Sequence, residues 1–356
     1  MSRPTAWQTR VRVGLVSSAV PLIQGGGRFI VDWLRQKLEE HGHSVAAIYL
    51  PSTDEPETIL QQMAAFRMVK FDSHFDRVVT FRPPSHMISH PQKVVWFIHH
   101  IRAFYDMWDG PYRPVPDLAP WRALRAQVIQ ADTVALSEAT RVFSNSRVVG
   151  DRLRAFNGID SEVLYPPVLD PGLFTEGERG DEIVCICRVE HHKRQHLLVE
   201  AMRHVRSQVR LRLCGLSSTP TYMAELLETV ARHDLGGRVT IENAWISEQS
   251  KAIRLAQSLA NAYVPLDEDS YGYPTVEAAH ARRCTLTFTD SGGTHEFVEH
   301  GVSGVIVAPE PVAIAEALDL LFEDRVRTRR MGKAAFERVT ALGISWDHVI
   351  ARLMAA

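Results

Sequence analysis

Short runs of β-branched and other apolar residues alternate along this chain with longer stretches of helical periodicity, and this alternation restricts the possible folds more than any other feature. In the first half, the predicted strands are residues 11–16, 44–49, 77–80, 94–98 and 141–144. Between the first two strands, residues 28–40 carry apolar side chains at the spacing of one helix face. Strands that alternate with helices in this way are typical of a parallel sheet with helices packed on it.

The same alternation starts again in the second half of the chain. The elements expected there are, in order, residues 182–187, 195–205, 210–213, 221–232, 239–241 and 262–265. Between the halves, from Tyr165 to Gly180, proline, glycine and charged residues accumulate without periodicity, as in a linker. A chain of 356 residues is also too long for one ordinary hydrophobic core. The sequence therefore predicts two doubly wound α/β domains, with a ligand site at the carboxyl ends of the strands that lines the cleft between the domains.

Composition and charge exclude two classes of protein. With 45% hydrophobic and 23% charged residues, the chain is expected to fold rather than to stay disordered. Its 40 Lys and Arg residues are balanced by 42 Asp and Glu residues, which gives a formal net charge of −2. A dedicated nucleic-acid binder needs a strong basic field, so no nucleic-acid partner is expected.

The N-terminus and the cysteines bear on the compartment. Residues 1–10 are polar and the first apolar run is only one strand long, so we predict neither a signal peptide nor a membrane span. The four cysteines lie in apolar, strand-like runs, which favours buried reduced thiols over disulfides or metal ligands. They are Cys185, Cys187, Cys214 and Cys284. The expected location is the cytoplasm, and peripheral contact with the inner membrane surface stays open.

The most informative segment is Asp269-Ser-Tyr-Gly-Tyr-Pro-Thr-Val-Glu277, which follows a predicted strand and opens a helix. Pro274 suits a first helical turn, and Gly272 lets the backbone approach a ligand closely. The free N–H groups of such a turn, together with the helix dipole, favour a phosphate. Glu277 lies one turn into the helix and projects from the same end. The segment therefore predicts a site for an anionic ligand that also carries hydroxyl groups.

This segment resembles the E-x7-E motif of glycosyltransferase family 4, also called glycosyl transferases group 1, with Asp269 in place of the first Glu. Arg188-Val-Glu-His-His-Lys193 is similar to the G-R-L-x3-K motif of that family, where Cys187 replaces the usual Gly and Arg194 the Gly that often follows the Lys.

Three further stretches resemble motifs of the same family. They are Thr289-Asp-Ser-Gly-Gly293 with Glu296, Gly301-Val-Ser-Gly304, and the glycine loop Gly25-Gly26-Gly27 after the first strand. Each motif alone is weak, but the set occurs in family order, and the similarity runs from Val11 to about Trp346.

The resemblance implies a GT-B fold, in which two Rossmann-like, doubly wound parallel-sheet domains face a cleft. Residues 1–168 would form the acceptor-binding domain and residues 169–340 the domain that binds the nucleotide-sugar. Residues 341–356 would form a helix that is able to cross back to the first domain. The implied activity is retaining transfer of a hexose-type sugar from a nucleotide-diphosphate-sugar to a hydroxyl of a saccharide or lipid-linked acceptor, in the synthesis of cell-surface polysaccharide or glycolipid.

Four residues are expected to act in catalysis. By the resemblance, Arg188 and Lys193 stabilise the diphosphate as it leaves, and Asp269 contacts the transferred sugar. His99, at the end of a predicted strand, matches a family histidine that also contacts this sugar, with His100 as the fallback. The aromatic residues from Arg102 to Trp108 suit an acceptor site and core packing about equally well.

The remaining predicted residues bind the donor. Glu277 is assigned to the ribose, and the turn that contains Gly272, Tyr273 and Thr275 to the phosphates. The glycine loop, through Gly26 and Gly27, is expected to let the ligand approach, and Trp245 and Ile246 to lie near the base.

Other chemistries fit the residues less well. Asp267-Glu268-Asp269 matches the D-x-D metal motif of the other large glycosyltransferase fold, but the basic pair Arg188 and Lys193 favours a site without metal or cofactor. A dinucleotide dehydrogenase is disfavoured, because the glycine loop is not G-x-G-x-x-G and the second strand ends at Tyr49-Leu50-Pro51 without the acidic residue expected for a ribose. A nucleotide-sugar epimerase and a catalytically silent nucleotide-sugar-binding assembly protein stay open as alternatives.

Overall fold

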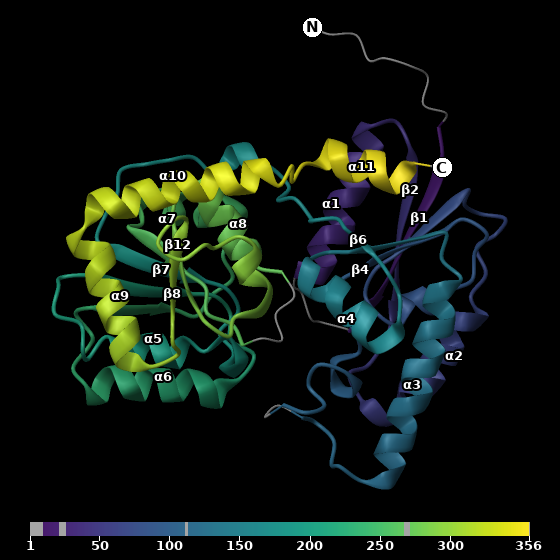
Figure 1. Cartoon of the computed structure of the whole chain (residues 1–356), viewed down its shortest axis with the longest axis horizontal. Coiled ribbons are helices and arrows are strands. Elements are labelled where there is room, and N and C mark those ends of the chain that lie inside the picture. The colour runs from purple at the N-terminus through teal and green to yellow at the C-terminus, as the bar shows by residue number, and fades with distance from the viewer. Residues whose placement is uncertain (1–9, 21–25, 111–112, 267–270, 356) are drawn as a thin grey trace, which may run out of the picture. The chain divides into compact units, whose positions relative to one another are not determined.

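The computed structural model describes residues 10–20, 26–110, 113–266 and 271–355. The chain separates into two compact units, each with its own parallel six-stranded sheet, as Figure 1 shows. One unit is Met1–Pro166 together with Ser345–Ala356, and the other is Pro167–Ile344. The prediction of two doubly wound parallel α/β sheets is confirmed.

The sheet of the N-terminal unit has the strand order β2-β1-β3-β4-β5-β6. Its strands are β1 (Arg12–Ala19), β2 (Ser44–Pro51), β3 (Arg77–Thr80), β4 (Lys93–Phe97), β5 (Arg141–Ser144) and β6 (Glu162–Val163). Every residue of β3 and β4 is buried, as expected for central strands that are covered on both faces. The strand order reverses at β1, which pairs with β2 on one side and β3 on the other.

Helices connect these strands and cover the sheet. They are α1 (Gly26–Glu40), α2 (Ile59–Met68), α3 (Ala119–Ser137) and α4 (Arg147–Asn157), with the short 3₁₀ helices η1 (Pro56–Thr58), η2 (Ser85–Met87) and η3 (Arg102–Phe104). The predicted helix 28–40 thus begins two residues earlier, and the strand predicted at 11–16 continues to Ala19 because β1 pairs with β2 as far as Pro51.

The last helix, α11 (Trp346–Met354), belongs to the N-terminal unit. Its apolar face is buried, and this face consists of Trp346, Val349, Ile350 and Leu353. Arg77 Nη1, at the start of β3, donates to the carbonyl oxygens of Leu353 (2.7 Å) and Ala355 (3.1 Å). These bonds satisfy carbonyl groups that a helix C-terminus otherwise leaves unpaired, so the end of the chain is fixed to the first sheet.

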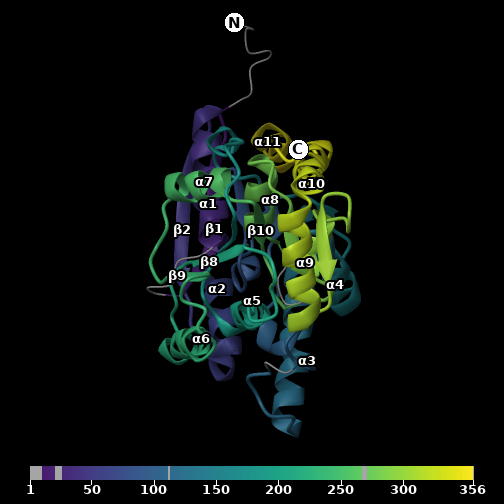
Figure 2. The same ribbon diagram turned by 90° about the vertical axis from the view of Figure 1, so that its left-hand side faces the viewer.

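The sheet of the C-terminal unit has the strand order β12-β11-β10-β7-β8-β9. Its strands are β7 (Glu182–Ile186), β8 (Arg210–Cys214), β9 (Val239–Glu242), β10 (Ala260–Ala262), β11 (Thr285–Phe288) and β12 (Gly304–Val307). Its helices are α5 (Gln195–Ala201), α6 (Pro220–Arg232), α7 (Glu248–Gln257), α8 (Tyr273–His280), α9 (Pro311–Glu323) and α10 (Arg325–Ala341), with η4 (Pro171–Leu173), η5 (His191–Lys193) and η6 (Gly292–Glu296). Figures 1 and 2 show α7 and α8 on one side of this sheet and α5 and α6 on the other.

The stretch that looks like a linker is tied to the C-terminal unit by buried arginines. Arg283 is fully buried and donates to the carbonyl oxygens of Gly177 (2.9 Å) and Ser258 (2.8 Å). Arg179 donates to the carbonyl oxygens of Leu259 (3.1 Å) and Arg282 (2.6 Å). Burial lowers the pKa of Arg283 to about 10, so the side chain stays charged at neutral pH and holds the segment by charge-assisted hydrogen bonds.

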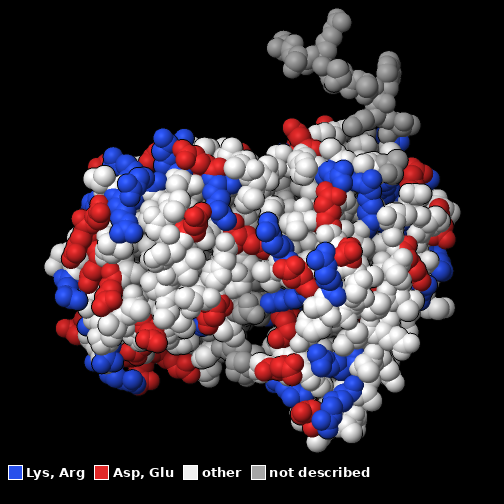
Figure 3. Space-filling view, viewed as in Figure 1, with Lys and Arg blue, Asp and Glu red and all other residues white. Residues whose placement is uncertain are grey.

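The surface carries charges of both signs, as the balanced composition predicts. On the face drawn in Figure 3, Lys and Arg side chains are interspersed with Asp and Glu in both units. Among the helices in the described ranges, none combines the length and the apolar character needed to cross a membrane.

Candidate functional site

The strand order of the C-terminal sheet reverses at β7, which pairs with β10 on one side and β8 on the other. In open parallel sheets, ligands bind beyond the carboxyl ends of the strands at such a switch point. The connection after β7 contains η5, and the connection after β10 leads toward α8. A hydrogen bond from the amide of Leu266 to the carbonyl oxygen of His192 (3.0 Å) ties the two connections together.

Lys193 spans this switch point. It is the last residue of η5, and its Nζ lies 3.2 Å from the hydroxyl of Tyr263, which follows β10. Its ammonium group also lies 5.4 Å from the centre of the Tyr263 ring. The structure therefore holds this predicted cation at the carboxyl edge of two adjacent strands.

Arg188 lies at the same edge but in different surroundings. Gln195 Nε2 donates to its carbonyl oxygen (2.9 Å), so its backbone is fixed. Its side chain is exposed and, within the described ranges, makes no hydrogen bond and no ion pair. The guanidinium group is thus available for an anion beside the switch point.

Arg194, which replaces a glycine of the family motif, makes several hydrogen bonds at this edge. It has a positive φ of 57° and is 6% exposed. Its guanidinium group forms a two-pronged ion pair with Asp290, with both N–O distances 2.7 Å. It also donates to the carbonyl oxygens of Val264 (3.0 Å) and Pro265 (2.7 Å). Arg194 therefore joins the turns that follow β7, β10 and β11.

Glu190 is a residue that the sequence did not single out. Its carboxylate accepts hydrogen bonds from the amide and hydroxyl of Ser218 and from Thr219 Oγ1 (3.0 Å). These bonds connect the turn after β7 to the loop after β8. A short-range sequence pattern gives no signal for such a pair, because the two segments meet only through the sheet.

The first turn of α8 comes close to Tyr263. A Cβ atom at Gly272 would lie 2.9 Å from the Tyr263 ring and 3.2 Å from Thr275 Oγ1, so a larger residue does not fit without displacement. The sequence predicts free N–H groups in this turn for a phosphate. The amide of Thr275, however, donates to the carbonyl oxygen of Gly272 (2.9 Å) and is not free. The Thr275 hydroxyl, in contrast, is buried and has no hydrogen-bond partner among the described residues.

Two further predicted site residues belong to the same sequence segment, and the structure describes only Tyr273. Tyr273 is the first residue of α8, and burial raises the pKa of its phenol well above its usual range. Asp269 and the sequence 267–269 that matches a metal motif lie outside the described residues.

Glu277 lies inside the unit rather than on its surface, with 2% of the residue exposed. Its Oε1 accepts a hydrogen bond from Lys251 Nζ of α7 at 2.7 Å, and Lys251 also contacts Glu248 Oε1 at 2.8 Å. Burial raises the pKa of Glu277, and the charge of Lys251 opposes this shift. Sequence reasoning missed Lys251, because its partner lies on another helix.

Trp245 and Ile246 lie in the connection from β9 to α7. Trp245 is 57% exposed, which is unusual for so large an aromatic side chain, and Ile246 is partly buried. An exposed indole ring of this kind offers a flat surface on which a nucleobase can stack.

In the N-terminal unit, His99 follows β4 and is partly buried. Its Nδ1 lies 2.6 Å from the carbonyl oxygen of His100. Because a carbonyl can only accept, we assign the proton to Nδ1, which leaves Nε2 as an acceptor. Burial, followed by the charge of Arg82, lowers the pKa of His99 to about 4, so the ring is neutral at pH 7.

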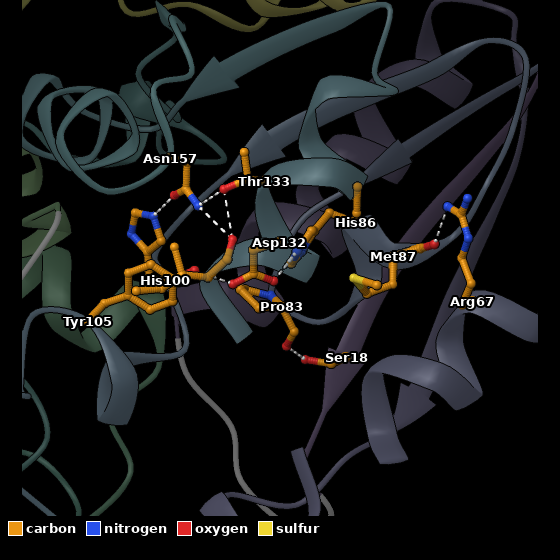
Figure 4. A network of polar contacts seen from close by, with 12 residues as sticks. Ser18, Arg67, Pro83, His86, Met87, His100, Tyr105, Asp132, Thr133 and Asn157 are labelled. Atoms are coloured by element: carbon orange, nitrogen blue, oxygen red, sulfur yellow. Dashed lines mark hydrogen bonds and ion pairs between the residues drawn. The ribbon is translucent and has the colours of Figure 1, made fainter. Parts of the chain in front are cut away.

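His100, the fallback residue, belongs to a buried network that Figure 4 shows. Its Nε2 lies 2.9 Å from Asn157 Oδ1, and its ring lies 4.2 Å from that of Tyr105. Tyr105 donates to Asp132 Oδ2 (2.6 Å), and His86 Nε2 lies 2.7 Å from Asp132 Oδ1. The network joins η2, the residue after η3, α3 and α4.

The aromatic segment after His100 packs in the core. Phe104, Tyr105 and Trp108 are at most 4% exposed. The guanidinium groups of Arg113 and Arg125 lie 4.2 and 4.9 Å from the Trp108 ring. Of the two readings that the sequence left open for these three side chains, core packing is the one that the structure supports.

Of the predicted glycine loop, Gly26 and Gly27 open α1, while Gly25 lies outside the described residues. A Cβ atom at Gly27 would lie 3.1 Å from Ile98 Cδ1, so the first turn of α1 packs closely against the residue before His99. The two predicted parts of the N-terminal site, Gly27 and His99, therefore lie near one another.

A surface hollow of about 340 Å³ is lined by residues of α2, η2 and α3, including Arg67, Val134 and Glu138, and contains none of the predicted site residues. Within the described ranges, no group of three or more His, Cys, Asp and Glu side chains is arranged to hold a metal ion.

The family model for "Glycosyl transferases group 1" matches residues 174–338, which include every residue described above for the C-terminal edge. Among curated proteins, the chain is 27% identical over 247 residues to human alpha-1,3/1,6-mannosyltransferase ALG2, covering 61% of this chain and 58% of that protein. It is 27% identical over 241 residues to the D-inositol 3-phosphate glycosyltransferase of Nocardia farcinica, covering 62% of this chain and 52% of that protein. The chain thus matches little more than half the length of these relatives.

Solved structures share the fold over nearly the whole chain. Sucrose-phosphate synthase from Thermosynechococcus elongatus superposes with a TM-score of 0.78 at 18% identity, covering 97% of each chain. Anabaena HepE in complex with UDP superposes with a TM-score of 0.69 at 15% identity, covering 96% of this chain and 98% of that one. At these identities the likeness establishes the fold alone.

Proposed function

Since residues 174–338 of this chain belong to the glycosyl transferases group 1 family, we propose that the protein is a retaining glycosyltransferase that uses a nucleotide-diphosphate-sugar donor. The transferred group is a hexose-type sugar and the acceptor a hydroxyl of a saccharide or lipid-linked molecule. The names of the curated relatives, a mannosyltransferase and an inositol-phosphate glycosyltransferase, support a sugar donor and a hydroxyl acceptor.

One observation carries this proposal. Arg188 and Lys193 follow β7 at the switch point of the C-terminal sheet, and the adjacent strand β10 leads to α8, which carries the buried carboxylate of Glu277. Cations and a helix N-terminus suit a diphosphate, and a carboxylate suits the hydroxyls of a ribose. A nucleoside diphosphate presents these groups together.

In the proposed reaction, the bond between the anomeric carbon and the diphosphate oxygen breaks while a bond to the acceptor oxygen forms on the same face. The proton of the acceptor hydroxyl passes to the leaving phosphate oxygen. Arg188 and Lys193 stabilise the negative charge that develops on this oxygen, and such electrostatic stabilisation is usually the largest catalytic contribution. We assign Asp269 to the sugar, and the positive charge of the pair makes a metal unnecessary.

We assign the N-terminal unit to the acceptor and His99 to the transferred sugar. The support is the neutral ring of His99, whose Nε2 is an acceptor for a sugar hydroxyl. We assign Gly26 and Gly27 to the same part of the site, since a Cβ atom at Gly27 would lie 3.1 Å from Cδ1 of Ile98, the residue before His99.

The proposal is tested by adding UDP-, GDP-, ADP- and dTDP-sugars in turn and measuring the thermal unfolding midpoint. A ligand that binds only the folded state raises this midpoint, and one or more donors are expected to do so. The Anabaena HepE complexes with UDP and UDP-glucose make UDP-glucose the first donor to test. The second test is turnover of the bound donor in the presence of EDTA. We expect the rate to change little, because no metal takes part in the proposed reaction. Binding without turnover, or interconversion of donor sugars in the absence of acceptor, would contradict the proposed function.

A further inference from the structure

The ion pair between Lys251 and Glu277 joins two helices of the C-terminal unit. Lys251 is on α7 and Glu277 on α8, and their Nζ and Oε1 atoms lie 2.7 Å apart. The side chains are 14% and 2% exposed, so the pair is largely removed from water. Glu277 Oε2 accepts no hydrogen bond from any residue in the described ranges.

Burial makes the charge state of Glu277 depend on this partner. A carboxylate in an apolar site is strongly disfavoured unless a cation and hydrogen bonds compensate it. Burial raises the pKa of Glu277, Lys251 lowers it, and Glu248 of α7 raises it. Lys251 stays charged because, although burial lowers its pKa, the attraction of Glu277 and Glu248 raises it above the usual value.

The other ionisable group beside the pair is Tyr273 at the start of α8. Burial, followed by the charges of Glu277 and Glu248, raises the pKa of its phenol well above the usual range, so Tyr273 adds no charge. In the described part of the chain, the charges that act on Glu277 are therefore those of Lys251 and Glu248 on α7.

We propose that Lys251 is a positioning residue of the nucleoside site, which holds Glu277 as an ionised acceptor for the hydroxyls of a ribose. This inference rests on the proposed function, and what it adds is the dependence of the ribose contact on Lys251, which is read from the preference for a ribonucleotide over its 2′-deoxy analogue. An ionised carboxylate accepts from both ribose hydroxyls, whereas a protonated one carries a hydrogen on one oxygen and loses part of this capacity.

The test is calorimetric titration of the full chain with UDP and GDP, each compared with its 2′-deoxy analogue, at about pH 6 and about pH 9.5. These pH values bracket the pKa of about 8–9 that buried carboxyl groups without a partner reach. Wild-type protein is expected to prefer the ribonucleotide at both pH values. In Lys251→Met, the ribonucleotide affinity is expected to fall about tenfold or more at the lower pH, as for a lost hydrogen bond to a charged group, and to recover at the higher pH.

Three variants keep the test decisive. Glu277→Gln is permanently neutral and should lose the ribose preference at both pH values, without recovery. Lys251→Arg keeps the positive charge and should show the ribose preference of the wild type. Comparison with Lys251→Met therefore separates the effect of the charge from that of side-chain packing. Lys333→Met removes an exposed lysine of α10 and should change nothing. If Lys251→Met proves unstable, Lys251→Gln replaces it as the neutral variant, and the same loss at the lower pH with recovery at the higher pH is expected.

Two results would overturn the inference. Lys251→Met protein that binds ribonucleotides like the wild type at low pH shows that Lys251 is not needed at the ribose. Equal loss of ribo- and deoxyribonucleotide binding at both pH values shows a merely structural role. A wild-type protein that binds neither UDP nor GDP contradicts the proposed function itself, which distinguishes that failure from the other two.

Discussion

Lys193 and Arg188 flank one turn, yet they differ in how far the structure has already fixed them. Lys193 Nζ is held by the Tyr263 hydroxyl at 3.2 Å, whereas the exposed guanidinium of Arg188 pairs with no described residue. A fixed cation costs no reorganisation when charge develops in the transition state. Lys193 is therefore the residue at which the diphosphate role is tested most sharply.

Replacing Lys193 by Ala is expected to lower kcat/KM by a factor that corresponds to about 2–4 kcal/mol of transition-state stabilisation. The reason is the loss of the positive charge that we propose to lie next to the leaving diphosphate. Initial rates with a saturating acceptor give this number. The matched control is Lys333→Ala on α10, where the side chain is exposed. Wild-type kinetics in the Lys193 variant would mean that Lys193 is an ordinary surface cation.

At the scale of elements, the helix that ends the chain depends on packing rather than on its own propensity. A helix of nine residues is too short to be stable alone in water, so α11 forms because its apolar face is buried in the N-terminal unit. Leu353 is fully buried there, and Arg77 binds the carbonyl oxygen of the same residue.

Leu353→Ala is therefore expected to reduce the free energy of unfolding by about 2–5 kcal/mol, because it removes buried methyl groups and leaves a cavity. Denaturant unfolding measures the loss. Val326→Ala on α10, at a side chain that is 82% exposed, is the control and should change stability by less than about 0.5 kcal/mol. A similar small effect at Leu353 would show that α11 is not held by this face.

Helices and strands could be predicted where a few consecutive residues are sufficient to indicate them. Strands such as β3 and β4 are recognised from consecutive apolar residues, and the start of α8 from Gly272 and Pro274. The aromatic segment around Trp108 was undecided, because buried and ligand-binding aromatics have the same sequence pattern.

The long-range pairs were not predictable. Arg194 and Asp290 are 96 positions apart, and Lys251 and Glu277 are on different helices. Only the strand order of the sheet brings such residues together, and no spacing in the sequence encodes that order.

Acid stability is a property of the whole molecule to which buried histidines contribute. His100 is 1% exposed, and burial lowers its pKa to about 4, against about 6.5 in an unfolded chain. Between these values the unfolded chain binds a proton that the folded chain does not. The free energy of unfolding therefore falls as the pH drops from about 6.5 to about 4, and is unaffected by this group above that window.

We expect His100 alone to contribute up to about 1.4 kcal/mol per pH unit in this window, and His99 and His196 to act in the same direction because burial also lowers their pKa values. Thermal unfolding at a series of pH values measures the slope. His100→Gln should flatten it, whereas His204→Gln, at an exposed position, should not. An unchanged slope in the His100 variant would contradict the assignment.

At the scale of the whole molecule, we propose that the sugar is transferred with retention of configuration, and the configuration of the first product tests this proposal. An inverting enzyme needs a general base, and His99, with a pKa of about 4, is a weak one at neutral pH. Asp106, the other candidate, is held between Arg102 (2.9 Å) and Arg152 (3.8 Å).

The measurement is proton NMR of the sugar released or transferred from an α-linked nucleotide-sugar, recorded before the anomers equilibrate. We predict that the α-anomeric signal appears first, since in the proposed reaction attack occurs on the face that the diphosphate leaves. A β-anomer formed first from an α-linked donor would contradict the account and would make His99 the catalytic base instead of a sugar contact.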